Sequence, residues 1–195
     1  MSPEAVNLYL NFSLNAILGR LSDADALMHR FGVEINHVAR AFAQRFPTTA
    51  TLYRGMLLDP SVPYAADPVY TFQSWSEDRD VALWFACPQS VISVEVAQVK
   101  PHLRGYLAEI PVARASLLFH HTWVAQLGGV DAFVALARQH PHMGHEGARQ
   151  IEWSLTTQRE VITMPVAGLH PQPVEDLPEQ TRTALDQRLA PAWML

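Results

Sequence analysis

The sequence predicts an α+β fold, with helices at the front of the chain and short strands behind them. Over residues 4–46 apolar residues recur every three or four positions, which is the spacing of an amphipathic helix. From Leu52 onward, short runs rich in β-branched and aromatic residues are separated by Pro, Gly and Asp, as in strands joined by turns. Hydrophobic residues make up 49% of the 195 residues, which suffices for one packed core. We expect one domain over 1–195, with a helical layer at 1–47, a core at 50–165 and a tail at 170–195 that packs on the core.

Composition and charge exclude several classes of protein. No apolar run approaches the roughly 20 residues that a membrane-spanning helix needs, so no membrane partner is expected. The first residues lack a basic segment followed by an apolar one, so we expect no signal peptide and a cytoplasmic protein, although effectors also leave cells by other routes. The single Cys87 fits a reducing compartment. A net charge of -5 gives no general attraction to nucleic acid, which would need a local basic patch.

The helical front is expected to contain three segments and no chemistry. The first carries apolar residues at helical spacing over 6–21. Ser22 and Asp23 are good capping residues, so a middle helix is expected to begin there and to end at Gly32. A third helix follows and stops at Pro47, which lacks a backbone donor.

Strands are expected after this front, with one helix among them. Residues 52–58 and 69–76 each form a short run rich in aromatic and aliphatic side chains. Ser76 is expected to cap a helix whose first turn is acidic and which ends at Pro88. Residues 91–96 alternate well enough to predict a third strand.

The second half of the chain ends in a strand with two polar residues on one face. The elements expected here are a strand at 106–110, a helix over 122–139 broken at Gly128-Gly129, a polar loop at 140–147, a strand at 158–162, a helix at 179–189 and an apolar end at 193–195 packed on the body. Side chains of a strand alternate, so Gln158 and Glu160 point to one face and Arg159 to the other. An amide beside a carboxylate suits the floor of a cleft better than a core.

Three motifs stand in order along the chain, and together they resemble a known family. The motifs are Tyr53-Arg54-Gly55, Ser74-Trp75-Ser76 and Gln158-Arg159-Glu160. Their order resembles that of the mono-ADP-ribosyltransferases of the arginine–serine–glutamate type. This family carries an arginine on a first strand, a Ser-x-Ser strand that leads into a helix, and a Glu/Gln-x-Glu strand near the end. The resemblance covers roughly residues 50–165, and it implies helices ahead of two small packed sheets that form an NAD-binding cleft.

The chemistry of NAD suits these residue types. Cleavage of the bond between ribose and nicotinamide passes through an oxocarbenium-like state, as in glycoside hydrolysis. Glu160 would stabilise the developing positive charge, and Arg54 would hold the phosphates. Ser74 and Ser76 would donate hydrogen bonds to the ribose, to nicotinamide or to Glu160 itself. Beside them, the expected NAD-binding set contains Tyr53, Gly55, Trp75 and Phe85, with Gly55 allowing close approach of the ligand.

Gln158 and Trp153 bear on the acceptor. The resemblance implies that members with Glu at the first position modify arginine, whereas members with Gln there modify asparagine or a nucleic-acid base. An amide pairs with another amide or a base edge, so arginine is the less favoured acceptor. Residues 153–157 stand where the family has a target-recognising turn, and Trp153 is expected to anchor the acceptor or to stack on a base. Glu152 competes with Glu160 for the catalytic place, but β-branched residues follow only Glu160, as in the family.

Plainer interpretations stand beside these assignments. Arg54 would pair with a surface carboxylate, Ser76 would serve only as a cap, and aromatic residues such as Trp75 and Phe85 are more often core. The histidines at 120, 121, 140, 142 and 145 suggest zinc, but no cysteine lies nearby and Pro141 indicates a loop, so we expect no metal. No Gly-x-Ser-x-Gly elbow is present, which disfavours a serine hydrolase.

The expected function is therefore transfer of ADP-ribose from NAD, as substrate, to a macromolecular acceptor with release of nicotinamide. The acceptor is a protein side chain or a nucleic-acid base. Two alternatives stay open: an NAD glycohydrolase with water as acceptor, and a non-catalytic module that binds a nucleotide or a partner. A role as toxin or effector would imply an inhibitory antitoxin or immunity partner.

Overall fold

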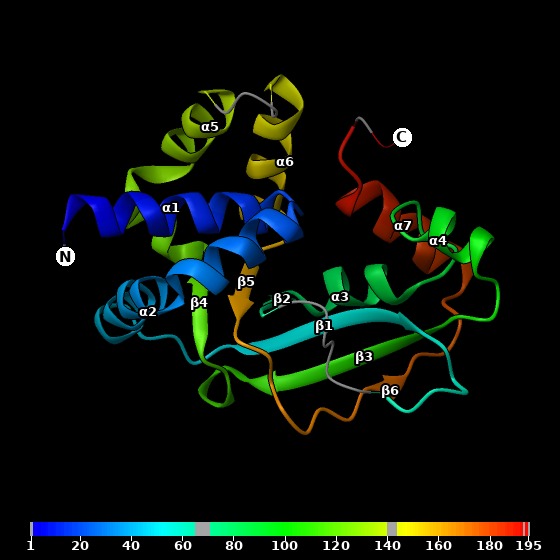
Figure 1. Ribbon diagram of the computed structural model, residues 1–195. Helices are drawn as coiled ribbons and strands as arrows, with labels where there is room; N and C mark the ends of the chain where they lie inside the picture. Colours follow the sequence, from blue (N-terminus) through cyan, green and yellow to red (C-terminus); the bar gives the residue numbers. More distant parts are fainter. Residues whose placement is uncertain (1, 65–70, 140–143, 193, 195) are drawn as a thin grey trace.

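The computed structural model describes residues 2–64, 71–139, 144–192 and 194. In these residues the chain is α+β, with helices first and one six-stranded antiparallel sheet behind them. Figure 1 shows α1 (Pro3–Ile17), α2 (Leu21–Arg45), α5 (Gly129–Gln139) and α6 (Gly144–Thr156) gathered at one end of the sheet. The other helices, α3 (Arg79–Ala86), α4 (Val94–Val99) and α7 (Glu179–Leu189), lie toward the other end.

The helical front consists of two helices rather than three. Ser2 caps α1 by accepting a hydrogen bond of 3.2 Å from the Ala5 amide. The expected middle helix does not end at Gly32, because α2 continues through it with only a kink at Phe31. Residues on both sides of the kink are buried in one core cluster against α1, so packing of a continuous apolar stripe outweighs the cost of glycine inside a helix.

One sheet replaces the two packed sheets that were expected. Its strands are β1 (Thr51–Leu58), β2 (Gln73–Ser76), β3 (Arg104–Pro111), β4 (Leu117–His120), β5 (Glu160–Thr163) and β6 (Gln172–Pro173), in the order β4-β5-β2-β1-β3-β6. The expectation is wrong because β2 pairs with β1 on one side and with β5 on the other. The β1–β2 pairing is confined to Tyr53 and Ser76, whereas β1 pairs with β3 along its whole length. The two halves of the sheet thus meet at one register position.

Helix α3 packs on β1 and β3 through two glycines. A Cβ on Gly55 would lie 1.7 Å from the Ala82 carbonyl oxygen, and a Cβ on Gly105 would lie 2.1 Å from the Ala86 carbonyl oxygen. Both distances are far inside van der Waals contact, so the backbone of α3 sits on the sheet only where side chains are missing. Gly55 was expected to admit a ligand, but the group that approaches it most closely is this helix.

The expected strand at 91–96 is wrong, since this segment is a turn followed by α4. The Ser90 hydroxyl donates to the Trp84 and Cys87 carbonyls at 2.7 and 2.9 Å, and the Ser93 hydroxyl donates to the Phe85 carbonyl at 2.9 Å. These local bonds hold the segment against the end of α3 and compete with strand formation.

Other boundaries differ in smaller ways. Asp78 rather than Ser76 caps α3, and its carboxylate accepts a hydrogen bond of 2.9 Å from the Asp80 amide. The expected polar loop at 140–147 is helical from Gly144 onward, and 140–143 lie outside the described residues. The break at Gly128-Gly129 is confirmed: Gly128 ends the 3-10 helix η2 (His121–Leu127) with φ 98°, in the left-handed region that favours glycine.

The C-terminal helix is confirmed as α7, which packs on α3. Buried Leu185 and Leu189 join Val81 and Trp84 in one cluster, and Met194 contacts it. Trp193 and Leu195 lie outside the described residues. Among the helices of the described segments, none combines the length and apolarity needed to cross a membrane.

Candidate active site

The three sequence motifs meet in one pocket of about 510 Å³. Its lining includes every residue that the sequence nominated for a functional role: Tyr53, Arg54, Gly55, Ser74, Trp75, Ser76, Phe85, Trp153, Gln158 and Glu160. The pocket lies where the two halves of the sheet meet, since Ser76 pairs with Tyr53 of β1 and with Glu160 of β5. Its volume falls in the range of small-molecule sites, roughly 300–1,000 Å³.

Glu160 begins β5 at the floor of the pocket and is only 7% exposed. The Ser74 hydroxyl donates a hydrogen bond of 2.5 Å to its carboxylate. Burial raises the pKa of Glu160 to about 7, although hydrogen bonds from the Ser74 and Ser154 hydroxyls partly offset this shift by favouring the charged form. A carboxyl with this pKa changes its charge near neutral pH.

Ser76 has a different role from Ser74. Its hydroxyl donates a hydrogen bond of 2.6 Å to the Gln158 carbonyl and accepts one of 2.9 Å from the Asp78 amide. Ser76 therefore joins the start of α3 to the backbone that leads into β5. The two serines of the motif therefore have separate roles. Ser74 binds the Glu160 carboxylate, and Ser76 binds the backbone that leads to it.

Gln158 and Glu160 both line the pocket, but strand alternation is not the reason. The strand begins only at Glu160, and Arg159 has a φ of 49°, in the left-handed region. The backbone N–H of Gln158 donates a hydrogen bond of 3.1 Å to the Trp153 carbonyl, which closes a turn after α6. The expectation of a strand over 158–162 was therefore wrong at its start, and a turn brings the two side chains together.

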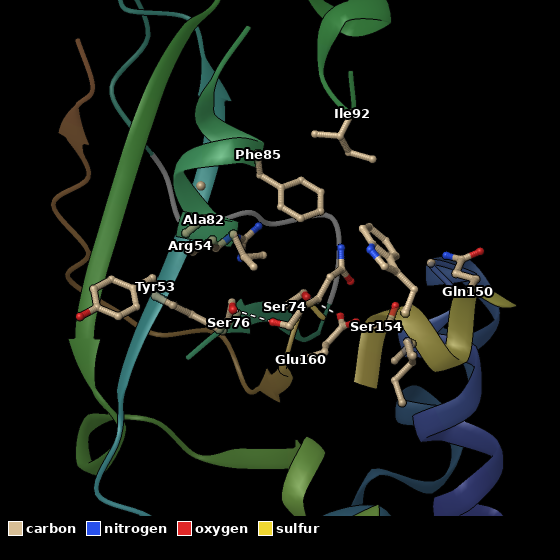
Figure 2. Close-up of a pocket in the computed structure, with 18 of the residues that line it drawn as sticks. Tyr53, Arg54, Ser74, Ser76, Ala82, Phe85, Ile92, Gln150, Ser154 and Glu160 are labelled. Atoms are coloured by element: carbon tan, nitrogen blue, oxygen red, sulfur yellow. Dashed lines mark hydrogen bonds between the residues drawn. The ribbon is translucent and has the colours of Figure 1, made fainter. Parts of the chain in front are cut away.

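Arg54 and Glu160 are the only charged residues among the described residues that line the pocket. Figure 2 shows Arg54 beside Ala82 and Phe85, across the pocket from Ser154 and Gln150. In the same view the Tyr53 ring points away from the centre of the pocket. The guanidinium and the carboxylate thus occupy different parts of one cavity.

The aromatic residues divide between core and pocket wall. Trp75 is 3% exposed, and its indole donates a hydrogen bond of 3.1 Å to the Thr163 hydroxyl. Phe85 is half-buried in the pocket wall. Trp153 was expected on a recognition turn, but it lies inside α6, donates to the Leu189 carbonyl at 2.8 Å and packs edge-to-face on Trp84. The turn assignment is wrong because 150–156 continue the helix, with Ile151 and Leu155 buried one turn apart.

Several lining residues were not nominated from the sequence. Ser154 and Gln150 come from α6, and the available signal was the i, i+4 spacing of buried Ile151 and Leu155, which indicates a helix. Others come from the end of α1, the following turn and the start of α2, although the helical front was expected to contribute packing alone. They are Ala16, Ile17, Gly19 and Leu21.

A separate group of titratable residues lies outside this pocket. Glu77 contacts His120 and His121 through its two carboxylate oxygens, at 3.0 and 2.7 Å from their Nε2 atoms. The sequence did not connect Glu77 with these histidines, which are more than forty residues away. His140 and His142 lie outside the described residues.

Comparisons of the chain with protein-family models, with curated proteins and with solved structures find no match.

Proposed function

We propose that the chain transfers ADP-ribose from NAD to a macromolecular acceptor and releases nicotinamide. The observation that carries this proposal is a buried carboxylate, Glu160, held by the Ser74 hydroxyl at 2.5 Å in a pocket whose other charged lining residue is Arg54. The reaction needs one anion near a developing cation and one cation for the phosphates. The pocket lining supplies one of each.

Arg54 would bind the pyrophosphate of NAD. A guanidinium holds phosphate oxygens through paired hydrogen bonds, and its half-buried position beside Phe85 would strengthen that attraction relative to open water. Three apolar lining residues, Ala82, Phe85 and Ile92, would cover the flat rings of the dinucleotide.

Glu160 would act on the ribose. The bond from C1′ to the nicotinamide nitrogen breaks, and its electron pair neutralises the positive ring, which leaves as nicotinamide. The ionised carboxylate stabilises the oxocarbenium charge that forms on the ribose. A lone pair of the acceptor then bonds to C1′, and the acceptor proton is released. Ser74 positions the carboxylate for this step.

The acceptor would be an uncharged group. The described pocket lining contains the amides of Gln150 and Gln158 and the Ser154 hydroxyl, and Glu160 is its only carboxylate. Amides pair with other amides and with base edges, whereas a guanidinium acceptor would require a second carboxylate. Asparagine-like amides and nucleic-acid bases are therefore preferred over arginine.

The test incubates the protein with labelled NAD and with cell protein or nucleic acid. Glu160→Gln is expected to lose transfer by about 100-fold or more, because a preorganised electrostatic partner of the transition state is removed. Glu152→Gln is the matched control, since Glu152 is exposed on α6 and does not line the pocket. Equal turnover of NAD by wild type and Glu160→Gln would contradict the proposal.

The same experiment separates the alternatives. Free ADP-ribose without any labelled macromolecule would assign the chain to NAD hydrolysis. NAD binding in calorimetry without turnover would assign it to a non-catalytic binding module. Mass spectrometry of the modified protein or nucleic acid would identify the acceptor atom.

A further inference from the structure

We propose that Glu77, His120 and His121 form a binding site for a zinc-type divalent metal, which joins the turn before α3 to the end of β4. The three ligand atoms, one from each residue, lie within 4.8 Å of one another. Two imidazole nitrogens and one carboxylate are a ligand set that zinc uses in proteins. None of the three residues lines the pocket described above, so the site is independent of the proposed transferase activity.

The two contacts between Glu77 and the histidines require only small adjustments to hold a metal. Tetrahedral bonds of about 2.0–2.1 Å place neighbouring ligand atoms about 3.3 Å apart. The carboxylate oxygens of Glu77 lie 3.0 Å from His120 Nε2 and 2.7 Å from His121 Nε2. A metal would replace the hydrogens that now bridge these atoms and would move each oxygen and nitrogen apart by a few tenths of an ångström. The two Nε2 atoms, which lie within 4.8 Å of each other, would come to about 3.3 Å.

Both histidines already present Nε2 to the same carboxylate, that of Glu77. His120 and His121 are neighbours in the chain, yet their rings stack with centroids 4.8 Å apart and an interplanar angle of 24°. The change from β4 to the 3-10 helix η2 between them turns both rings to one side. In a continued strand, neighbouring side chains would point in opposite directions.

A second contact orients the buried ring. His120 is 1% exposed, and its Nδ1 lies 2.8 Å from the Thr122 hydroxyl. Without a metal this Nδ1 accepts a hydrogen bond of 3.3 Å from the Thr122 backbone amide. With a metal on Nε2, the hydrogen of the neutral ring moves to Nδ1, which gives up the bond from this amide and donates to the Thr122 hydroxyl instead. Metal-binding histidines generally use their other nitrogen in this way. His121 and Glu77 are 16% and 17% exposed through their side chains, which leaves a path for the metal and room for a water as fourth ligand.

A bound metal would stabilise the part of the fold that carries the serine motif. Glu77 follows Ser76 directly, and His120 pairs with Val161, the residue after Glu160. The site therefore joins the residue after β2 to the end of β4, and both strands pair with β5 at the side of the pocket floor. We assign it a structural role, because it does not face the pocket.

The experiment titrates the metal-free full chain with zinc chloride and measures heat of binding and thermal unfolding. We expect one zinc per chain and a rise in the unfolding temperature, and both should be lost in Glu77→Gln and in His121→Asn. His102→Asn is the matched control, because His102 also faces a carboxylate, Asp59 at 3.6 Å, and no third ligand joins them among the residues that the structure describes. Magnesium at the same concentration should have no effect, since it prefers oxygen ligands.

Cobalt(II) provides a readout of the ligands themselves. Wild type should show the intense visible absorption of four-coordinate cobalt, and Glu77→Gln and His121→Asn should not. Circular dichroism checks that these variants fold; if Glu77→Gln does not, the folded His121→Asn variant decides alone. Zinc binding that survives in a folded Glu77→Gln or His121→Asn variant, or that is lost in His102→Asn, would overturn the proposal. The absence of one-to-one binding by wild type would also overturn it.

Discussion

Glu160 combines near-complete burial with a hydrogen-bond donor on its carboxylate. Its pKa of about 7 lies above the usual 4.5 because burial disfavours the charge more than the hydroxyls of Ser74 and Ser154 favour it. At the scale of single residues, this carboxyl is the group whose behaviour the site depends on most.

The first prediction concerns stability and pH. Below pH 4.5 the Glu160 carboxyl is protonated in both the folded and the unfolded chain; between 4.5 and about 7 it is protonated mainly in the folded chain. The free energy of unfolding therefore falls as pH rises through this window, by about 3 kcal/mol from this group. Glu160→Gln removes this dependence. The free energy of unfolding of the variant should therefore rise relative to that of wild type as the pH increases from 4.5 to 7. Urea unfolding of both proteins at pH 5 and pH 8 measures how the difference between their free energies of unfolding changes. The same difference at both pH values would refute the prediction.

The second prediction separates the two serines. With the proposed activity, kcat/KM for NAD rises with pH as Glu160 ionises. Ser74→Ala removes a hydrogen bond that lowers the pKa of Glu160, so the midpoint of this rise should move to higher pH. Ser76→Ala breaks the bond to the Gln158 carbonyl instead, and should cost about 1–3 kcal/mol of stability with little change in the midpoint. Equal midpoint shifts in the two variants would show that the roles are not divided.

At the scale of elements, the contact between α3 and the sheet decides where the pocket wall stands. Gly55→Ala would place a methyl group 1.7 Å from the Ala82 carbonyl oxygen, so α3 must move or the chain must lose stability by at least 1–3 kcal/mol, as is typical of overpacking. Gly32→Ala is the control, for which the change in stability should have the opposite sign. Its Cβ would lie 3.8 Å from the Met28 side chain inside α2, an ordinary van der Waals contact. It should stabilise by about 0.5–1 kcal/mol.

Chemical denaturation of both glycine variants measures these effects. A Gly55→Ala protein as stable as wild type would show that α3 does not rest on β1 as closely as described. Loss of stability in Gly32→Ala would show that the kink at Phe31 needs glycine beside it.

At the scale of the whole molecule, the C-terminal helix holds the far wall of the pocket. Asp186 of α7 accepts hydrogen bonds from the Trp84 indole at 2.7 Å and from the Val91 amide at 3.1 Å. The Leu189 carbonyl accepts one from Trp153 at 2.8 Å. Residues near the end of the chain thereby fix α3, the following turn and α6, which all contribute to the pocket lining.

Removal of this link should weaken both stability and substrate binding. Asp186→Ala leaves the indole of buried Trp84 without its acceptor, which costs about 1–3 kcal/mol. With the proposed activity, KM for NAD should rise because the turn that carries Ile92 loses the hydrogen bond from the Val91 amide to Asp186. Gln187→Ala is the control, since Gln187 is exposed on the same helix. Unfolding curves and NAD kinetics test both effects. An Asp186→Ala protein with the same stability and the same KM as Gln187→Ala would refute them.

The sequence by itself determined the α+β class, the positions of β1, β3 and α7, and the residues that line the pocket from β1, β2 and the start of β5. The fold class and the elements depend on local signals: apolar periodicity, β-branched runs, and Gly and Pro at boundaries. The pocket residues were nominated instead by the order of three motifs, which resembles that of a known family. Tertiary structure decided that β2 joins both halves into one sheet, that 94–99 and 144–156 are helices, and that Glu77 meets His120 and His121. Strand partners and long-range burial depend on residues far apart in the chain, so no local pattern contains them.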